Sequence, residues 1–388
     1  MADASPPQTV AKVTRAKQTL RQRWHRLRTP PRLPYLLFFG LLVAGRLAQV
    51  YCYWWDVRIT RMLDRCNGSV ERVRFYPPWV RKSLGDPFVS HFEPIWRVHL
   101  SRYVPQNNEV ARRGHDARPS DLRLLRGTLF LRELTLYGPL SDGDVKHLKC
   151  LTQLRTLTCS GHPESAIDGV EHLPNLTCLH LHYLRSANAT LFKQLASMPK
   201  LESLHISFND RHDPSKNVAE GMRELAKSQT LRRLEGQLFD DEFLALTSVL
   251  PDGSPPLPEL REVRQSNSQS SLLTDRGLAN LRNLPSLLHL DLRWSKVTDQ
   301  GLTQLKELPF LRTLYLGDCA GITDEGAAIL ATMPGLESLN ISQTKITPAG
   351  VLRVATLPRL RCLRATYYGP EVRDQLRQTL PVGCELVY

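Results

Sequence analysis

Residues 298–322 read TDQGLTQLKELPFLRTLYLGDCAGI, and three neighbouring stretches repeat this pattern. They are TDRGLANLRNLPSLLHLDLRWSKV from Thr274, TDEGAAILATMPGLESLNISQTKI from Thr323 and TPAGVLRVATLPRLRCLRATYYGP from Thr347. Successive copies therefore begin 24, 25 and 24 residues apart. A fixed period in this range, with leucines spaced as Leu-x-x-Leu-x-Leu, indicates a solenoid built from stacked units.

Each copy predicts one short strand and one short helix. Leu311, Leu314 and Leu316 have the spacing of a strand whose alternate side chains enter a core. Thr298 and Asp299 then predict a helix start, where a capping hydroxyl and an acid suit the free amides and the positive end of the helix dipole. One unit cannot bury its own leucines, so we expect the stack itself to be the fold.

The repeated Thr-Asp-x-Gly-Leu pattern resembles the leucine-rich repeat family, in particular its cysteine-containing subtype. The segment PPWVRKSLGDPF, residues 77–88, is similar to one that precedes the first repeats in membrane-anchored leucine-rich repeat proteins of planctomycete-type bacteria. The resemblance implies an α/β solenoid with a curved parallel sheet on the concave side and short helices on the convex side. The resemblance covers roughly residues 70–388 and concerns the fold, and it says little about the ligand.

The leucine spacing extends backward from these copies. It predicts repeats over residues 129–388, with loop-like insertions at 208–216, 251–258 and 264–271. Strand-like hits near Val70 and Ile95 lie 25 residues apart, which is one repeat interval. We therefore expect residues 70–128 to form an amino-terminal cap and a first, irregular repeat.

The amino-terminal part predicts a membrane anchor. Residues 1–32 are basic and polar and predict a flexible cytoplasmic tail, and residues 33–55, LPYLLFFGLLVAGRLAQVYCYWW, are long and apolar enough to span a bilayer. Residues 56–69 then form a juxtamembrane linker. Arg46 interrupts the apolar run and leaves a cleaved signal or a buried helix as alternatives. Seven Lys or Arg before the span and five after it favour a cytoplasmic amino terminus, with the repeats on the extracytoplasmic side.

The distribution of charge and of cysteines argues against two classes of protein, nucleic-acid-binding proteins and disulfide-rich proteins. The formal net charge is +13, but residues 1–33 hold eight Lys or Arg and one acid. Because this tail supplies much of the excess, we expect no nucleic-acid surface on the repeats. The eight cysteines lack the regular spacing of a disulfide framework.

The candidate binding residues lie between the inward leucines, where side chains face the concave surface. Arg264, Arg293 and Tyr315 are the expected anchors, since Arg and Tyr are enriched at binding hot spots. The full predicted partner-binding set is His180, His182, His205, Glu235, Arg264, Asp291, Arg293, Tyr315, Asn340 and Arg364.

The sequence contains no catalytic motif, so we expect no enzyme activity and no cofactor. Cys178, His180 and His182 share one strand face, and His205 lies on the next strand, so a zinc site is a geometric alternative. Residues two apart on one strand face stand nearly 7 Å apart, which argues against tetrahedral coordination.

The sequence as a whole predicts a membrane-anchored scaffold that binds a protein or peptide partner on its concave face. One alternative is a substrate adaptor of a ubiquitin-ligase complex, because F-box proteins carry similar repeats. An F-box needs about 45 helical residues where this chain has its apolar segment. The second alternative is a metal-dependent enzyme that uses His180, His182 and His205.

Overall fold

The computed structural model describes residues 58–59, 69–72, 95–101, 122, 124–125, 128, 130–137, 147–160, 170–184, 189–208, 218–265 and 273–388. The chain divides into two compact units, and all described residues lie in the second, Arg58–Pro78 with Glu93–Tyr388. The predicted tail, the apolar segment 33–55 and most of the linker lie outside the described residues. Among the residues described, no helix has the length and hydropathy needed to cross a bilayer.

One sheet runs through the second unit. Its strands follow each other in sequence order, and each strand from β2 onward pairs in parallel with the next. This order is that of a solenoid, as the repeat predicted. The described strands are β1 Ser69–Arg72, β2 Ile95–Ser101, β3 Glu133–Tyr137, β4 Thr156–Ser160, β5 Cys178–Leu184, β6 Ser203–Phe208, β7 Arg233–Gly236, β8 Glu262–Gln265, β9 His289–Asp291, β10 Thr313–Tyr315, β11 Ser338–Asn340, β12 Cys362–Arg364 and β13 Glu385–Val387.

The first strand pair departs from the repeat. β1 pairs with β2 in the antiparallel direction, with Val70 opposite Val98. The interval of 25 residues between these two strands is therefore not a solenoid repeat, because consecutive repeat strands must run in parallel. The spacing alone could not distinguish the two directions, since it records only the distance along the chain.

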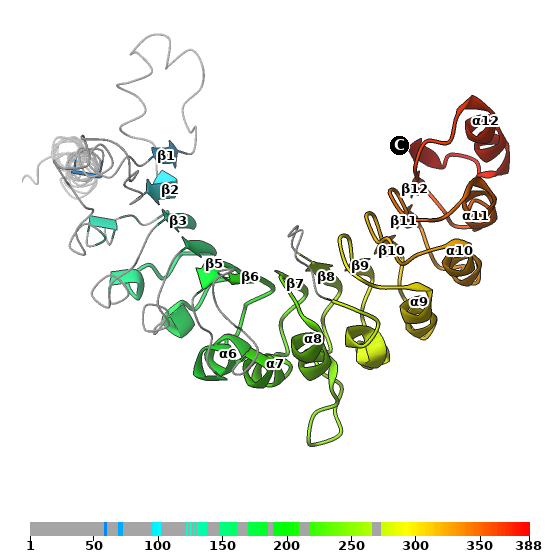
Figure 1. Ribbon diagram of the computed structural model, residues 1–388. Coiled ribbons are helices and arrows are strands. Elements are labelled where there is room, and N and C mark those ends of the chain that lie inside the picture. The colour runs from blue at the N-terminus through cyan, green and yellow to red at the C-terminus, as the bar shows by residue number, and fades with distance from the viewer. Residues whose placement is uncertain are drawn as a thin grey trace, which may run out of the picture. The chain divides into compact units, whose positions relative to one another are not determined.

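Short helices connect the strands and lie on the outer side of the curved sheet, whereas the strands line its inner side (Figure 1). This arrangement matches the predicted concave sheet and convex helices. The first of the four most regular copies differs from the others, because its connection is a 3₁₀ helix and not an α-helix. The described helices are η4 Val170–His172, α6 Ala189–Ala196, α7 Val218–Leu225, α8 Asp240–Thr247, η6 Gly277–Asn283, α9 Asp299–Leu305, α10 Asp324–Leu330, α11 Pro348–Val354 and α12 Pro370–Thr379.

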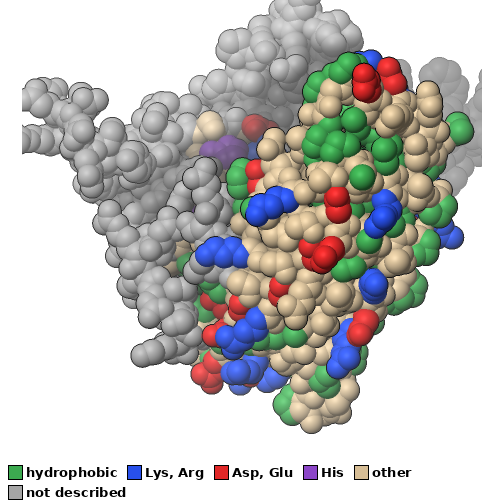
Figure 2. Space-filling model, turned by 45° about the vertical axis from the view of Figure 1, so that its right-hand side comes forward, with side chains coloured by type: hydrophobic (Ala, Val, Ile, Leu, Met, Phe, Trp, Pro, Cys, Tyr) green, Lys and Arg blue, Asp and Glu red, His purple; other side chains and the backbone are tan. Residues whose placement is uncertain are grey.

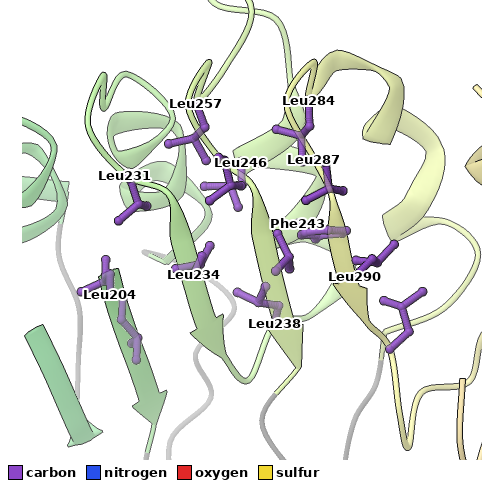
Figure 3. Close-up of a cluster of buried hydrophobic side chains, with 14 of the residues drawn as sticks. Leu204, Leu231, Leu234, Leu238, Phe243, Leu246, Leu257, Leu284, Leu287 and Leu290 are labelled. Carbon is purple, nitrogen blue, oxygen red and sulfur yellow. The ribbon is translucent and has the colours of Figure 1, made fainter. Parts of the chain in front are cut away.

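The core lies between the sheet and the helices. In Figure 3, leucines of several repeats, such as Leu234 of β7 and Leu290 of β9, point into this space, where Phe243 of α8 also lies. The inward leucines of a single repeat, Leu311, Leu314 and Leu316, have exposed fractions of 3% or less. Burying one leucine side chain stabilises the fold by roughly 1.5–3 kcal/mol, so the repeated leucines dominate the folding free energy.

The Thr-Asp pair of each copy links neighbouring repeats. Asp299 Oδ1 accepts a hydrogen bond from the backbone N–H of Thr323 at 2.9 Å, and Asp299 Oδ2 accepts one from the Thr323 hydroxyl at 2.6 Å. Equivalent pairs of bonds join Asp240 to Thr274, Asp275 to Thr298 and Asp324 to Thr347. We call these contacts the Asp-Thr links.

The Asp-Thr links correct the role that the sequence predicted for the acids. We expected Asp299 to serve the free amides of its own helix, but its carboxylate serves the next repeat. The threonine caps its own helix instead, since the Thr298 hydroxyl accepts from the Gln300 N–H and the Thr323 hydroxyl from the Glu325 N–H. The sequence shows that Thr and Asp recur together but not which repeat each one contacts.

The glycine of the Thr-Asp-x-Gly pattern makes room for this link. A Cβ atom on Gly301 would lie 2.2 Å from Asp275 Oδ1, and one on Gly326 would lie 2.2 Å from Asp299 Oδ1. No real Cβ atom approaches an oxygen so closely. The pattern is therefore a structural requirement of stacking, and it carries no information about ligands.

Candidate functional site

The predicted column of concave residues is aligned in space. Backbone pairing places His180 beside His205, Glu235 beside Arg264, and Asp291 beside Tyr315. The alternation of side chains along a strand puts all members of such a column on one face of the sheet. In register, the column consists of Thr135, Thr158, His180, His205, Glu235, Arg264, Asp291, Tyr315, Asn340 and Arg364.

Two members of the predicted set do not present their side chains to a partner. The exposed fractions of Asp291 and Asn340 are only 4% and 6%. The Asn340 amide oxygen accepts from the backbone N–H and the hydroxyl of Ser342, so it holds the turn that follows β11. The Asp291 carboxylate does the same after β9, where it accepts from the backbone N–H of Arg293 at 3.1 Å. Both residues therefore stabilise the turns that border the concave face and do not contact a partner themselves.

Arg293 and Tyr315 lie beside each other above Asp291. The Arg293 guanidinium binds both carboxylate oxygens of Asp291, with Nη2 2.7 Å from Oδ2. Its central carbon lies 5.8 Å from the centre of the Tyr315 ring, which is within the range of a cation–π contact. The hydrogen bonds that Arg293 donates to the Asp291 carboxylate raise the pKa of Arg293, so the guanidinium stays charged. These contacts hold two of the three expected anchors in place.

A hollow of about 370 Å³ opens on the concave face over β7, β8, β9 and β10. We call it the arginine hollow, because Arg233 and Arg264 reach it from adjacent strands. Both donate through Nε to the carboxylate of Glu262, Arg233 at 2.5 Å. The lining consists of Arg233, Glu262, Val263, Arg264, His289, Leu290, Asp291, Thr313 and Tyr315.

The three candidate histidines form a cluster on β5 and β6. Ring centres of His182 and His205 lie 4.6 Å apart, and those of His180 and His205 lie 5.6 Å apart with the planes nearly parallel at 16°. Cys178 Sγ lies 3.0 Å from His180 Nε2. His205 Nδ1 lies 3.4 Å from a carboxylate oxygen of Glu235.

Two histidines of this cluster, His180 and His182, have lowered pKa values that favour the neutral imidazole. Burial, followed by the neighbouring His205 and His180, lowers the pKa of His182 to about 4. Burial and His205 also lower the pKa of His180. A hydrogen bond from His205 lowers the pKa of Glu235, which is therefore ionised at neutral pH. The cluster consequently offers hydrogen-bonding rings and one negative charge.

The cluster does not have the geometry of a metal site. Among the described residues, no group of three or more His, Cys, Asp or Glu side chains is arranged to hold a metal ion. The rings of His180 and His205 are nearly parallel. The lone pairs of their nitrogens therefore point in parallel planes and do not converge on one metal ion, as tetrahedral coordination requires. The described part of the chain therefore gives no support to a metal-dependent enzyme that uses His180, His182 and His205.

Comparison with known families identifies the repeat. A family model described as a leucine-rich repeat region matches residues 144–384. The chain belongs to this leucine-rich repeat family. Leucine-rich repeat domains generally bind protein partners and act as interaction scaffolds without enzymatic activity. The finer resemblance to the cysteine-containing subtype and to planctomycete-type proteins is not addressed by this match.

Solved structures of two leucine-rich repeat proteins from Listeria monocytogenes are similar to this chain. Internalin C2 shares 20% sequence identity over 58% of this chain and 84% of its own, with a TM-score of 0.38. The internalin InlF shares 15% identity over 75% of this chain and 86% of its own, with a TM-score of 0.41. No curated protein sequence matches the chain. The space expected for an F-box lies largely outside the described residues, so the adaptor alternative gains no support from the structure.

The sequence-based set missed part of the leucine-rich repeat surface. Arg233, Glu262 and His289 line the arginine hollow, yet none of them was predicted. Each lies two residues before a predicted member on its strand, so the alternation that selected Glu235, Arg264 and Asp291 selects these three as well. Trp294 was also missed. It is 38% exposed and has a positive φ of 66°, a conformation that bulky residues rarely adopt.

Proposed function

We propose that the chain is a membrane-anchored scaffold that binds a protein or peptide partner on the concave face of its repeat domain. The observation that carries the proposal is the aligned column from His180 to Arg364, in which polar, charged and aromatic side chains lie on one rigid sheet. A rigid surface loses little conformational freedom on binding, so more of the contact energy contributes to affinity.

The anchor rests on the sequence alone. Residues 33–55 have the length and apolar character of a bilayer-spanning helix, and the basic residues before them favour a cytoplasmic tail. In this orientation the repeats face an extracytoplasmic partner. Protease treatment of intact cells should then remove the repeats and leave the tail protected. Loss of the tail with survival of the repeats would refute the orientation.

A photo-crosslinking experiment tests the concave face. A photoreactive amino acid replaces Tyr315 in the full-length chain, expressed in the cells that produce it naturally. The matched control carries the same amino acid at Ala279, an exposed position on η6 of the outer side. We expect protein adducts from position 315 and none from position 279. Adducts only from position 279, or equal adducts from both, would contradict the proposal.

A further inference from the structure

Two arginines share one carboxylate in the arginine hollow. Arg233 and Arg264 both use Nε to bind Glu262, whose side chain is only 11% exposed. The arginine side chains themselves are 53% and 50% exposed. Within the described part of the chain, their terminal nitrogens make no hydrogen bond. A guanidinium carries five N–H donors, so each arginine has four more besides the Nε–H that binds Glu262.

The carboxylates of the hollow are turned inward, whereas its cations face outward. Asp291 is 4% exposed and is satisfied by Arg293, and Glu262 lies beneath its two arginines. An approaching partner therefore meets the guanidinium groups first. His289, Thr313 and Tyr315 complete the opposite side with hydrogen-bonding and aromatic groups.

This arrangement matches a carboxylate on a partner. Planar guanidinium groups bind carboxylates through paired N–H donors, and such charge-assisted bonds are roughly twice as strong as neutral ones. We propose that the arginine hollow binds an acidic side chain of an extended protein segment, held between Arg233 and Arg264 with Tyr315 as the aromatic contact. The inference rests on the proposed function and specifies the chemistry of the partner.

The surroundings favour a discrete acidic side chain over a nucleic-acid strand. Glu235, ionised by its contact with His205, lies next to Arg264 in the same column. On the side of the carboxyl-terminal repeats seen in Figure 2, basic and acidic side chains of the described residues are interspersed. A strand that carries a phosphate at every nucleotide requires a continuous basic stripe, whereas one or two carboxylates fit the hollow alone.

Fluorescence anisotropy with a labelled hexaglutamate peptide tests the proposal on the purified full-length chain. We expect Arg233→Gln and Arg264→Gln each to weaken binding about tenfold, the loss typical of a charge-assisted hydrogen bond. Arg261→Gln is the matched control. The Arg261 side chain is also 53% exposed, but it precedes β8 and its guanidinium lies 3.9 Å from a carboxylate oxygen of Glu259. We expect this variant to stay within about twofold of the wild type.

A second pair of variants tests for an increase in affinity. A misfolded variant would lose affinity, so misfolding cannot produce this result. Glu262→Gln removes the negative charge that both arginines share and should tighten hexaglutamate binding several-fold, whereas Glu259→Gln, at a 46% exposed side chain, should not. Equal effects at positions 233 and 261, no binding by the wild type, or equally tight binding of a hexauridylate RNA would each overturn the proposal. If hexaglutamate fails to bind while position 315 still crosslinks to a protein, the acidic ligand is wrong but the concave binding function stands.

Discussion

At the scale of single residues, Asp299 shows how one side chain connects two repeats. Its two hydrogen bonds to Thr323 satisfy a backbone N–H and a hydroxyl of the next repeat. Asp299→Ala removes both acceptors, and we expect a loss of about 1–3 kcal/mol in the free energy of unfolding, measured by urea titration. Asp299→Asn should cost less, because its amide oxygen still accepts from the Thr323 N–H.

The control for this prediction is Asp252→Ala. Asp252 makes a similar pair of bonds to Ser254, but within a single exposed turn. Its replacement should change the unfolding free energy by no more than about 0.5 kcal/mol. Equal losses at positions 252 and 299 would show that the Asp-Thr link has no special role in stacking.

Glu242 should make the stability of the fold depend on pH. Burial raises its pKa to about 8, although the carboxylate accepts from the backbone N–H of Phe239. The folded state therefore holds a proton that the unfolded state releases near pH 4.5. This contribution is complete below pH 4.5 and disappears as the pH rises through about 8.

Thermal unfolding between pH 5 and pH 9 can measure this effect. Glu242→Gln keeps an acceptor oxygen but cannot ionise, so the variant should gain stability over the wild type as the pH rises, by a few kcal/mol at pH 9. Glu371→Gln, in the exposed first turn of α12, is the control and should follow the wild-type curve. Parallel curves for wild type and Glu242→Gln would exclude the proposed ionisation.

At the scale of elements, the contact between consecutive helices depends on one glycine per repeat. Alanine is the better helix former by about 1 kcal/mol, so propensity alone predicts that Gly301→Ala in α9 is stabilising. The new Cβ would instead lie 2.2 Å from Asp275 Oδ1 and displace the Asp-Thr link. We expect a net loss of about 1–3 kcal/mol in the free energy of unfolding.

Gly335 offers the matched control for this substitution. Its added Cβ would meet the Leu311 carbonyl oxygen at 3.4 Å, an ordinary contact, and its φ is not positive. Gly335→Ala should therefore be nearly neutral in the same urea titration. A stabilising effect of Gly301→Ala would mean that propensity outweighs the link.

Elements also show which parts of the structure could be predicted from the sequence. The concave column was predictable because a period of two along a strand fixes the face of every side chain once the leucines are buried. The burial of Asp291 and Asn340 was not, because it depends on hydrogen bonds to the turns that follow β9 and β11. The direction of β1 and the partners of the Asp-Thr links depend on pairing between segments, which spacing does not record.

In the whole repeat domain, each repeat contacts chiefly its two neighbours. A destabilising substitution in a central repeat should therefore affect both neighbours, whereas one in the last repeat should affect only one. Leu314 is fully buried in β10, between β9 and β11. Leu314→Ala leaves a cavity that costs about 2–5 kcal/mol. Leu386 in β13 is only partly buried and pairs with β12, so Leu386→Ala should cost less.

Hydrogen exchange distinguishes these two defects by location. In Leu314→Ala we expect faster exchange of backbone amides on both sides of the substitution, in β9 and in β11, because the stack loses its continuity there. In Leu386→Ala faster exchange should be confined to β12 and β13, since a stack can fray from an end without disturbing the remaining repeats. If both variants accelerated exchange equally along all described strands, the domain would unfold as one cooperative unit. The Asp-Thr links would then couple the unfolding of one repeat to that of all the others. The residues of the concave face would in that case lose their arrangement in a single step.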